Sequence, residues 1–303
     1  MTLRFGILGA GGIVPPHLTA IAANPATEAL HLCDSRLDVA QALAAQFGVP
    51  KVSANPQAVI DDPEVDAVIC ALPTFLHSEW LARAALAGKQ LLTEKPLCRT
   101  VTEGKALLEV VERAGVALAV GYMRRFSAAR EEVRRLVQSG ALGTPVTWVN
   151  SSWGPRSDFY RGPANWMWDL TRGGGMVMDG SIHDFDFACW VLGKPATLFA
   201  ESALISDVVT APTQASALAR FEAGHYLSYT AAWQEGDFGT GAEPQRLVGP
   251  KGTLVLEGEW SFTWHDAPGH SRTLAWEPSD YFAAQLAAFR SEERRVGKEC
   301  RSR

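Results

Sequence analysis

The first 120 residues alternate short apolar runs with helical patterns, and this alternation constrains the fold more than any other feature of the chain. The predicted strands are residues 4–8, 29–33, 67–72, 90–93 and 116–120. The predicted helices between them are residues 37–47, 80–87 and 101–114, each followed by a glycine, the usual residue just beyond a helix. This order is typical of βαβ units, so we expect a doubly wound α/β domain built on a parallel sheet.

The pattern changes from about residue 123 onward. One predicted helix, 128–137, precedes strand-like runs that are separated by turns containing glycine or proline. These runs are residues 146–151, 198–204, 215–221, 226–233 and 253–257. We predict a second, α+β domain with a mainly antiparallel sheet.

The last fourteen residues, 290–303, differ from the rest in composition: six are basic, three are acidic and one, Val296, is aliphatic. A basic tail can bind nucleic acid or a membrane, but this string resembles a translated sequencing adapter over its whole length. We therefore expect the tail to be non-native, the preceding helix 281–289 to stop without a cap, and the native C-terminus to be missing. The predicted domains are residues 1–122 and 123–289.

A glycine-rich turn, Gly9-Ala10-Gly11-Gly12, follows the first predicted strand and leads into a helix. Gly9 permits a tight turn, and Gly11 lets the backbone approach a pyrophosphate at the helix N-terminus. Val14 replaces the third glycine of the dinucleotide-binding fingerprint, and the two prolines that follow it fit only in a first helical turn. The incomplete fingerprint is weak evidence by itself.

A carboxylate strengthens this evidence. Asp34 ends the second predicted strand about 20 residues beyond the turn, where a ribose-binding acid is expected. Asp34 would repel a 2′-phosphate, which favours NAD, whereas Arg36 can accept that phosphate and leaves NADP open as a second cofactor. The alternative is a solvated aspartate at a strand end.

Composition excludes several classes of function. The net charge of −5 gives no support to nucleic-acid or anionic-membrane binding, which needs a basic face. No apolar run approaches the roughly 20 residues of a membrane span, and the first strand begins too close to Met1 for a signal peptide. The five cysteines show no metal-type spacing. We expect a cytoplasmic protein with reduced thiols and a small-molecule ligand.

Five motifs in a fixed order give the chain a family resemblance. They are Gly9-x-Gly11-Gly12-Ile13, Leu72-Pro73-Thr74-x-x-His77, Glu94-Lys95-Pro96-Leu97, Gly121-Tyr122-Met123-Arg124-Arg125-Phe126, and Gly173-Gly174-Gly175 with Asp179-x-x-x-His183-x-x-Asp186. With them the chain resembles the glucose–fructose oxidoreductase, inositol dehydrogenase and rhizopine-catabolism (Gfo/Idh/MocA) family. The resemblance implies an NAD(P)-binding Rossmann domain, then a domain with a large open-faced sheet that forms homodimers or homotetramers. Thr74 stands where asparagine is commoner in the family.

The resemblance also implies the cofactor-binding residues. The full set of predicted cofactor-binding residues includes Asp34 and Arg36, at the end of the second strand. The set is Gly9, Gly11, Gly12, Ile13, Asp34, Arg36, Leu72, Pro73, Thr74, His77, Glu94 and Lys95. For His77, a cofactor contact and a purely helix N-terminal position remain equally open.

Oxidation of a secondary alcohol needs a base for the hydroxyl proton, and histidine suits this role because its pKa lies near the working pH. The motif assigns it to His183, with Asp179 one helical turn earlier on the same face. Lys95 would donate to the substrate oxygen and stabilise developing alkoxide. The plainer alternatives are a lysine in a surface turn and a structural Asp–His pair. No metal is assigned, because hydride transfer does not need one.

Side chains that could contact a sugar are Tyr122, Arg124, Trp153, Arg156 and Trp168, although the tryptophans suit a sheet core or an oligomer interface equally well. The prediction is an NAD(P)-dependent oxidoreductase acting on a secondary alcohol of a cyclic polyol or sugar. One alternative is a redox-neutral glycosidase that uses NAD transiently. The other is a non-catalytic sugar- or nucleotide-binding protein with the same fold.

Overall fold

The computed structural model describes residues 2–155, 165–204, 209–234 and 243–301, which form two compact units. The first unit comprises Met1–Met123 with Asp280–Arg303, and the second comprises Arg124–Ser279. The sequence pattern places residues 280–289 in the second domain, but the structure places them in the first unit. The reason is that Leu286 and Phe289 are buried in the core of the first unit.

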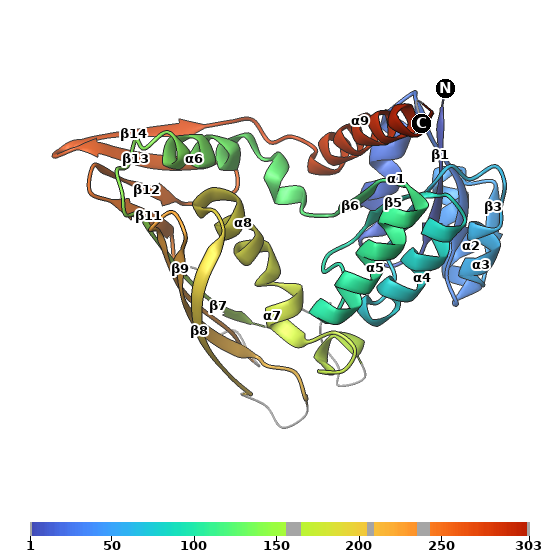
Figure 1. Ribbon diagram of the computed structural model, residues 1–303, viewed down its shortest axis with the longest axis horizontal. Coiled ribbons are helices and arrows are strands. Elements are labelled where there is room, and N and C mark those ends of the chain that lie inside the picture. The colour runs from blue at the N-terminus through green and yellow to red at the C-terminus, as the bar shows by residue number, and fades with distance from the viewer. Residues whose placement is uncertain (1, 156–164, 205–208, 235–242, 302–303) are drawn as a thin grey trace. The chain divides into compact units, whose positions relative to one another are not determined.

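The first unit is built on a six-stranded parallel sheet (Figure 1), and its strands have the order β3-β2-β1-β4-β5-β6. Its strands are β1 (Leu3–Leu8), β2 (Thr27–Cys33), β3 (Lys51–Ser53), β4 (Ala67–Cys70), β5 (Gln90–Thr93) and β6 (Leu118–Val120). All five predicted strands are present, and the short strand β3 is an addition. The prediction of a doubly wound α/β domain is confirmed.

Helices cover both faces of this sheet. They are α1 (Val14–Ala23), α2 (Leu37–Phe47), α3 (Pro56–Ile60), α4 (Thr74–Leu86), α5 (Val101–Ala114) and α9 (Tyr281–Arg301). Along β1, Phe5 and Ile7 join one core with α1, α2 and α9, whereas Leu8 joins a second core with α3, α4 and α5. Burial on both faces explains why the strands read as continuous apolar runs.

Helix bounds in the first unit follow local sequence closely. Helices α2 and α5 have the predicted bounds, and Gly48 and Gly115 just beyond them adopt φ values of 71° and 65°. These values lie in the left-handed region that glycine enters without a steric penalty. Helix α4 begins at Thr74, earlier than predicted, and Pro73 lies directly before its first turn.

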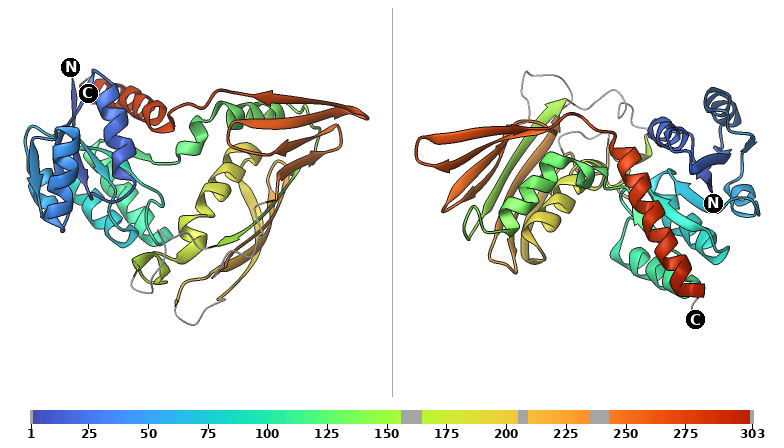
Figure 2. Two further views of the ribbon diagram at one scale, coloured as in Figure 1. Left: turned by 180° about the vertical axis from the view of Figure 1, so that it is seen from behind. Right: turned by 90° about the horizontal axis from the view of Figure 1, so that it is seen from above.

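Helix α9 packs on α1 within the first unit (Figure 2, right). The rings of Phe289 and Phe5 lie 6.1 Å apart, and the edge of the His17 ring contacts Phe282 at 4.8 Å. The helix continues to Arg301 instead of ending at Phe289, because the residues beyond are mostly good helix formers without a proline. None of the helices in the described residues is long and apolar enough to span a membrane.

The second unit is built on an eight-stranded sheet with the order β14-β13-β12-β11-β7-β10-β9-β8. Its strands are β7 (Thr147–Pro155), β8 (Pro195–Ala203), β9 (Gln214–Phe221), β10 (Tyr226–Gln234), β11 (Gln245–Gly249), β12 (Gly252–Leu256), β13 (Ser261–Ala267) and β14 (His270–Ala275). Among the described strands of this second sheet, only β7 and β10 pair in parallel, so the prediction of a mainly antiparallel sheet is confirmed.

Two helices, α6 (Ala128–Gln138) and α8 (Ile182–Leu192), pack on one face of the second sheet (Figure 2, left). At the centre of this core, the Trp148 ring meets the Phe187 ring edge-on at 5.2 Å. Residues on β9 alternate between buried and exposed, so its second set of side chains points to the opposite face. We call this opposite side, which carries Val149 and Leu218, the open face.

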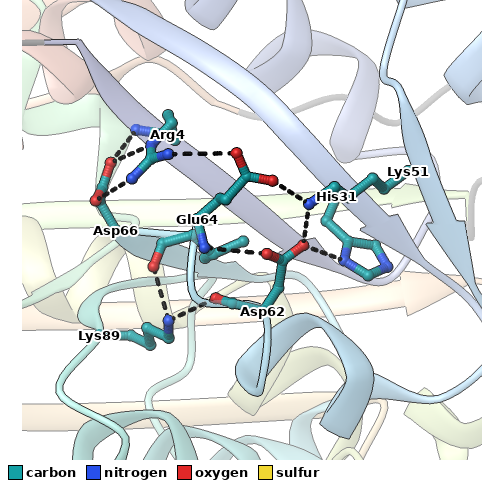
Figure 3. A network of polar contacts seen from close by, with 8 residues as sticks. Arg4, His31, Lys51, Asp62, Glu64, Asp66 and Lys89 are labelled. Carbon is teal, nitrogen blue, oxygen red and sulfur yellow. Dashed lines mark hydrogen bonds and ion pairs between the residues drawn. The ribbon is translucent and has the colours of Figure 1, made fainter.

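Figure 3 shows a network of charged side chains around the amino ends of β1, β3, β4 and β5. Arg4 and Asp66 form a two-pronged ion pair, with Nε 3.0 Å from Oδ2. Lys89 donates to the carbonyl oxygens of Asp62 and Val65 at 2.8 and 2.7 Å, and burial lowers the pKa of this lysine. The network fastens the loop between α3 and β4 to the strands beside it.

Candidate functional site

The candidate residues of the first unit gather where its parallel strands end, at what we call the carboxyl edge. The glycine-rich turn follows β1, Asp34 follows β2, Leu72 follows β4, and Lys95 follows β5. From β1 the chain first adds β2 and β3 on one side of the sheet and then β4, β5 and β6 on the other, so the order switches between β1 and β4. In open parallel sheets, ligands bind at the carboxyl edge near this switch point.

The glycine-rich turn has the geometry of a phosphate-binding loop. Gly9 has a φ of 102°, and a Cβ there would lie 2.5 Å from the carbonyl oxygen of Ala71, so only glycine fits. A Cβ at Gly11 would meet no atom within 4 Å, which leaves its backbone open to a ligand. Helix α1 begins at Val14, so Pro15 and Pro16 do fall in its first turn, as predicted. These residues therefore fit a dinucleotide cofactor.

Asp34 is fixed beside this turn. One carboxylate oxygen accepts from the Ala10 amide at 2.9 Å, and the other accepts from the Arg36 amide at 2.9 Å. Burial by itself would raise the pKa of Asp34, but the two amides and the Arg36 guanidinium outweigh it and hold the pKa below its ordinary value. An ionised, oriented carboxylate therefore lies at the end of β2, while the Arg36 side chain is mostly exposed.

Lys95 lies in a tightly held turn after β5. The Glu94 amide donates to the Cys70 carbonyl at 2.8 Å, and the Glu94 carboxylate accepts from Nε2 of His17 at 2.8 Å. His17 is a residue that the sequence analysis missed. The sequence feature that could have revealed it is a polar side chain on the sheet-facing side of α1, next to the buried Val14 and Leu18. Glu94 is thus engaged by helix α1.

His77 lies in the first turns of α4 and is almost fully buried. Its Nδ1 is 2.9 Å from the Pro96 carbonyl oxygen, and its Nε2 is 2.7 Å from the Leu72 carbonyl oxygen. Burial lowers the pKa of His77, and the two carbonyls oppose this shift because each can only accept a hydrogen bond. Both ring nitrogens are therefore directed at the protein backbone.

In the second unit, Asp179 is the last residue of α7 (Gly175–Asp179), and His183 lies in the first turn of α8. The pair therefore spans two helices joined by a turn, whereas the sequence pattern predicts one helix. Gly180 in this turn lets the Trp233 ring approach, because a Cβ there would lie 3.3 Å from it. The Gly180 and Ser181 amides both donate to the Met176 carbonyl, at 2.9 and 3.0 Å, and this irregular turn separates the two helices.

Ion pairs anchor helix α8 just after His183. Arg124, in the 3-10 helix Met123–Phe126, lies 3.3 Å from Asp184, and Nε of Arg125 lies 2.9 Å from Asp186. Burial raises the pKa of Asp184, and Arg124 counteracts that rise. Tyr229 donates to the Ser181 hydroxyl at 2.6 Å. The guanidinium of Arg124, a predicted substrate contact, is thus engaged within the protein.

The other predicted substrate contacts lie in different environments. Trp168 is only 1% exposed and meets Trp233 edge-on at 5.0 Å, which favours a core role. Trp153 lies on the open face with Val149 by strand alternation, which favours an interface role. Tyr122 follows β6 and is half-buried, and Arg156 lies outside the described residues.

Family profiles match most of the chain. The profile described as an oxidoreductase family with an NAD-binding Rossmann fold matches residues 3–122. The profile of the GFO/IDH/MocA C-terminal domain matches residues 131–255. Both units therefore carry the signature of one family, in the order expected.

Individual relatives agree with the profiles. The scyllo-inositol 2-dehydrogenase (NAD(+)) of Bacillus subtilis (strain 168) is 34% identical over 196 residues, which cover 64% of this chain and 55% of the relative. The chain thus spans little more than half the length of that enzyme. The dTDP-3,4-didehydro-2,6-dideoxy-alpha-D-glucose 3-reductase of Streptomyces violaceoruber is 30% identical over 325 aligned positions, covering 98% of this chain and 86% of the relative.

Among solved structures, KijD10, a 3-ketoreductase from Actinomadura kijaniata in complex with NADP and TDP-benzene, superposes with a TM-score of 0.84. The match covers 98% of this chain and 91% of the other, at 24% identity, and it supports the fold. The two profiles, the Streptomyces relative that aligns with 98% of this chain, and this architecture agree: the chain belongs to the Gfo/Idh/MocA family of oxidoreductases.

Proposed function

We propose that this protein is an NAD(P)-dependent oxidoreductase that transfers hydride between nicotinamide and a secondary alcohol carbon of a sugar or cyclic polyol. The observation that carries the proposal is the carboxyl edge of the first sheet. There a glycine turn with an open backbone, an oriented carboxylate and a lysine follow the ends of three strands. Relatives with names that specify inositol, glucoside and dTDP-sugar substrates support the substrate class.

In the proposed reaction the nicotinamide, when bound, accepts or supplies the hydride. Lys95 donates a hydrogen bond to the substrate oxygen and stabilises the negative charge that develops there during oxidation. His183 takes the proton of the hydroxyl group, and Asp179 binds a neighbouring hydroxyl or orients the imidazole. The substrate thus loses one hydride from carbon and one proton from oxygen.

The proposal favours NAD over NADP. The Asp34 carboxylate is ionised and lies beside the glycine turn at the end of β2, so it would accept from ribose hydroxyls and repel a 2′-phosphate. Both cofactors occur among similar proteins: the Bacillus enzyme is named for NAD(+), and KijD10 was solved with NADP. The exposed Arg36 leaves a route by which NADP can bind more weakly.

We also propose that the open face forms a homodimer or homotetramer. Phe199 and Leu218 are 66% and 59% exposed and lie opposite each other on β8 and β9. The same cross-strand row continues through Ser228 to Val149. A largely apolar, exposed row of this kind suits a second copy of the same sheet. The four described cysteines are free, and two are buried, which supports a cytoplasmic location.

The proposal is tested by the near-ultraviolet absorbance of reduced nicotinamide, with a panel of inositols, aldoses, glucosides and 3-keto sugars and with both cofactors. A change of absorbance with one polyol or sugar supports the proposed reaction. Loss of that turnover in Lys95→Ala and in His183→Ala supports the assigned roles. Full turnover in both variants would refute those roles. NADH binding without net turnover on any sugar would favour the redox-neutral glycosidase.

A further inference from the structure

Two buried histidines hold the residues on either side of Lys95. Glu94 precedes the lysine and is bound by His17 from α1, while Pro96 follows it and is bound by His77 from α4. Neither histidine is adjacent to Lys95 in the sequence, and the two come from helices on opposite faces of the sheet. The turn that carries the lysine is therefore fixed from both faces.

The contact from His17 fixes the side before the lysine. The Glu94 carboxylate can only accept, so Nε2 of His17 carries the hydrogen in their 2.8 Å bond. Glu94 also packs against Gly121, where a Cβ would lie 3.2 Å from the carboxylate oxygen. On its other side the His17 ring meets the Phe282 ring edge-on. The carboxylate therefore has little room to move.

The contact from His77 fixes the side after the lysine. Its ring bridges the carbonyl oxygens of Leu72 and Pro96, in the segments after the adjacent strands β4 and β5, with one nitrogen facing each carbonyl. The neutral ring donates to one of these carbonyls at a time, and the protonated ring donates to both. The bridge keeps these segments together at the carboxyl edge. Both ring nitrogens are thereby committed to main-chain carbonyls, so a role as a cofactor contact has less support than the sequence motif gave it.

We propose that His17 and His77 are positioning residues for Lys95, which they act on through Glu94 and Pro96. The inference rests on the proposed function, in which Lys95 donates to the substrate oxygen. A catalytic group displaced by about 1 Å can lose about 100-fold in rate. Loss of either histidine therefore lowers kcat although neither one touches the substrate.

A second buried histidine–carboxylate pair in the same unit serves as a control. It distinguishes a positioning role near Lys95 from an ordinary packing role. His31 and Asp62 form a similar buried contact at 3.2 Å, within the network at the amino ends of the strands (Figure 3). Substitution of His31 should therefore cost stability much as substitution of His17 does. It should leave Lys95 undisturbed, because its partners lie in the loop before β4.

The first experiment measures the reactivity of Lys95 by trace acetylation with acetic anhydride and peptide mass spectrometry, with the exposed Lys105 as internal reference. Acetylation of Lys95 should rise about threefold or more in His17→Leu and in His77→Gln, because the turn opens more often. It should stay at the wild-type level in His31→Leu. Wild-type acetylation in folded His17→Leu and His77→Gln would overturn the proposal.

The second experiment uses amide replacements at position 77, which differ in the bond that they keep. The amide nitrogen of asparagine replaces Nδ1 and can still bind Pro96, whereas that of glutamine replaces Nε2 and can bind only Leu72. We expect kcat to fall about 100-fold in His77→Gln and much less in His77→Asn, with KM for the cofactor unchanged. Equal kcat values in these two variants would contradict the proposal.

A Lys95→Met background distinguishes failure of this inference from failure of the proposed function. If Lys95→Met keeps its turnover, the role of the lysine is wrong and the positioning role falls with it. If Lys95→Met is inactive while His17→Leu and His77→Gln keep wild-type kcat, only the positioning role is wrong. If positioning holds, adding His77→Gln to Lys95→Met causes no further loss of residual activity.

Discussion

Replacement of Asp34 by asparagine tests the cofactor site most directly. The residue is 9% exposed, and its side chain accepts one amide hydrogen bond on each carboxylate oxygen, from Ala10 and from Arg36. Asparagine has the same shape but only one accepting oxygen, so one of the two amides loses its partner. The change also removes the charge that would bind ribose hydroxyls and repel a 2′-phosphate.

The magnitude follows from the bonds that are lost. A hydrogen bond to a charged group contributes about 1.5–3 kcal/mol, which corresponds to about 10- to 150-fold in Kd. We therefore expect Asp34→Asn to bind NADH about 10- to 150-fold more weakly, while its affinity for NADPH falls less or rises. Loss of the internal amide bond should also lower Tm by several degrees in the absence of cofactor.

The stability effect has a defined dependence on pH. The pKa of Asp34 is lowered in the folded chain, so its contribution is fully present above the pKa of unfolded aspartate, about 3.9. The contribution is lost as the pH falls through the lower folded value. Wild type and Asp34→Asn should therefore differ in unfolding free energy at neutral pH and converge in acid.

The assay is fluorescence titration with NADH and NADPH, together with thermal denaturation across pH. Asp62→Asn is the matched control, because Asp62 is also 9% exposed and accepts from Lys51 and the Glu64 amide, far along the strands from the glycine turn. It should lose stability without any change in cofactor preference. An unchanged ratio of NADH to NADPH affinity in Asp34→Asn would refute the assigned role of this carboxylate.

Three further perturbations test other parts of the structure. Lys95→Met should lower kcat/KM for the alcohol by about 100-fold or more in steady-state kinetics, with little change in NADH affinity by titration. An equal loss of cofactor affinity would contradict a role at the substrate oxygen. Leu218→Asp on the open face should reduce the mass measured by light scattering, whereas Leu108→Asp, at a 50% exposed site on α5, should not; an unchanged oligomer would exclude this face. Phe289→Ala should destabilise the first unit by about 3–5 kcal/mol in denaturant unfolding, because the ring is buried against α1 and β1; an effect below 1 kcal/mol would mean that α9 does not hold this core.

Much of the first unit could be predicted because its signals are local. The apolar runs of β1 and β4, the bounds of α2 and the positive φ at Gly48 each follow from a few neighbouring residues. The glycine turn and Asp34 could be recognised for the same reason, since their spacing along the chain reflects one βαβ unit. The sequence motifs also placed Lys95 at a strand end correctly.

Tertiary structure alone decided which distant residues meet. His17 binds Glu94 across 77 positions, and α9 joins the first unit because Phe289 packs on Phe5 near the other end of the chain. Likewise Trp168 is buried and Trp153 lies on the open face only because of where α8 covers the second sheet. A sequence pattern shows that a side chain is apolar, polar or able to donate. Its partner depends on long-range packing, in which buried polar groups must find each other and apolar faces must be covered.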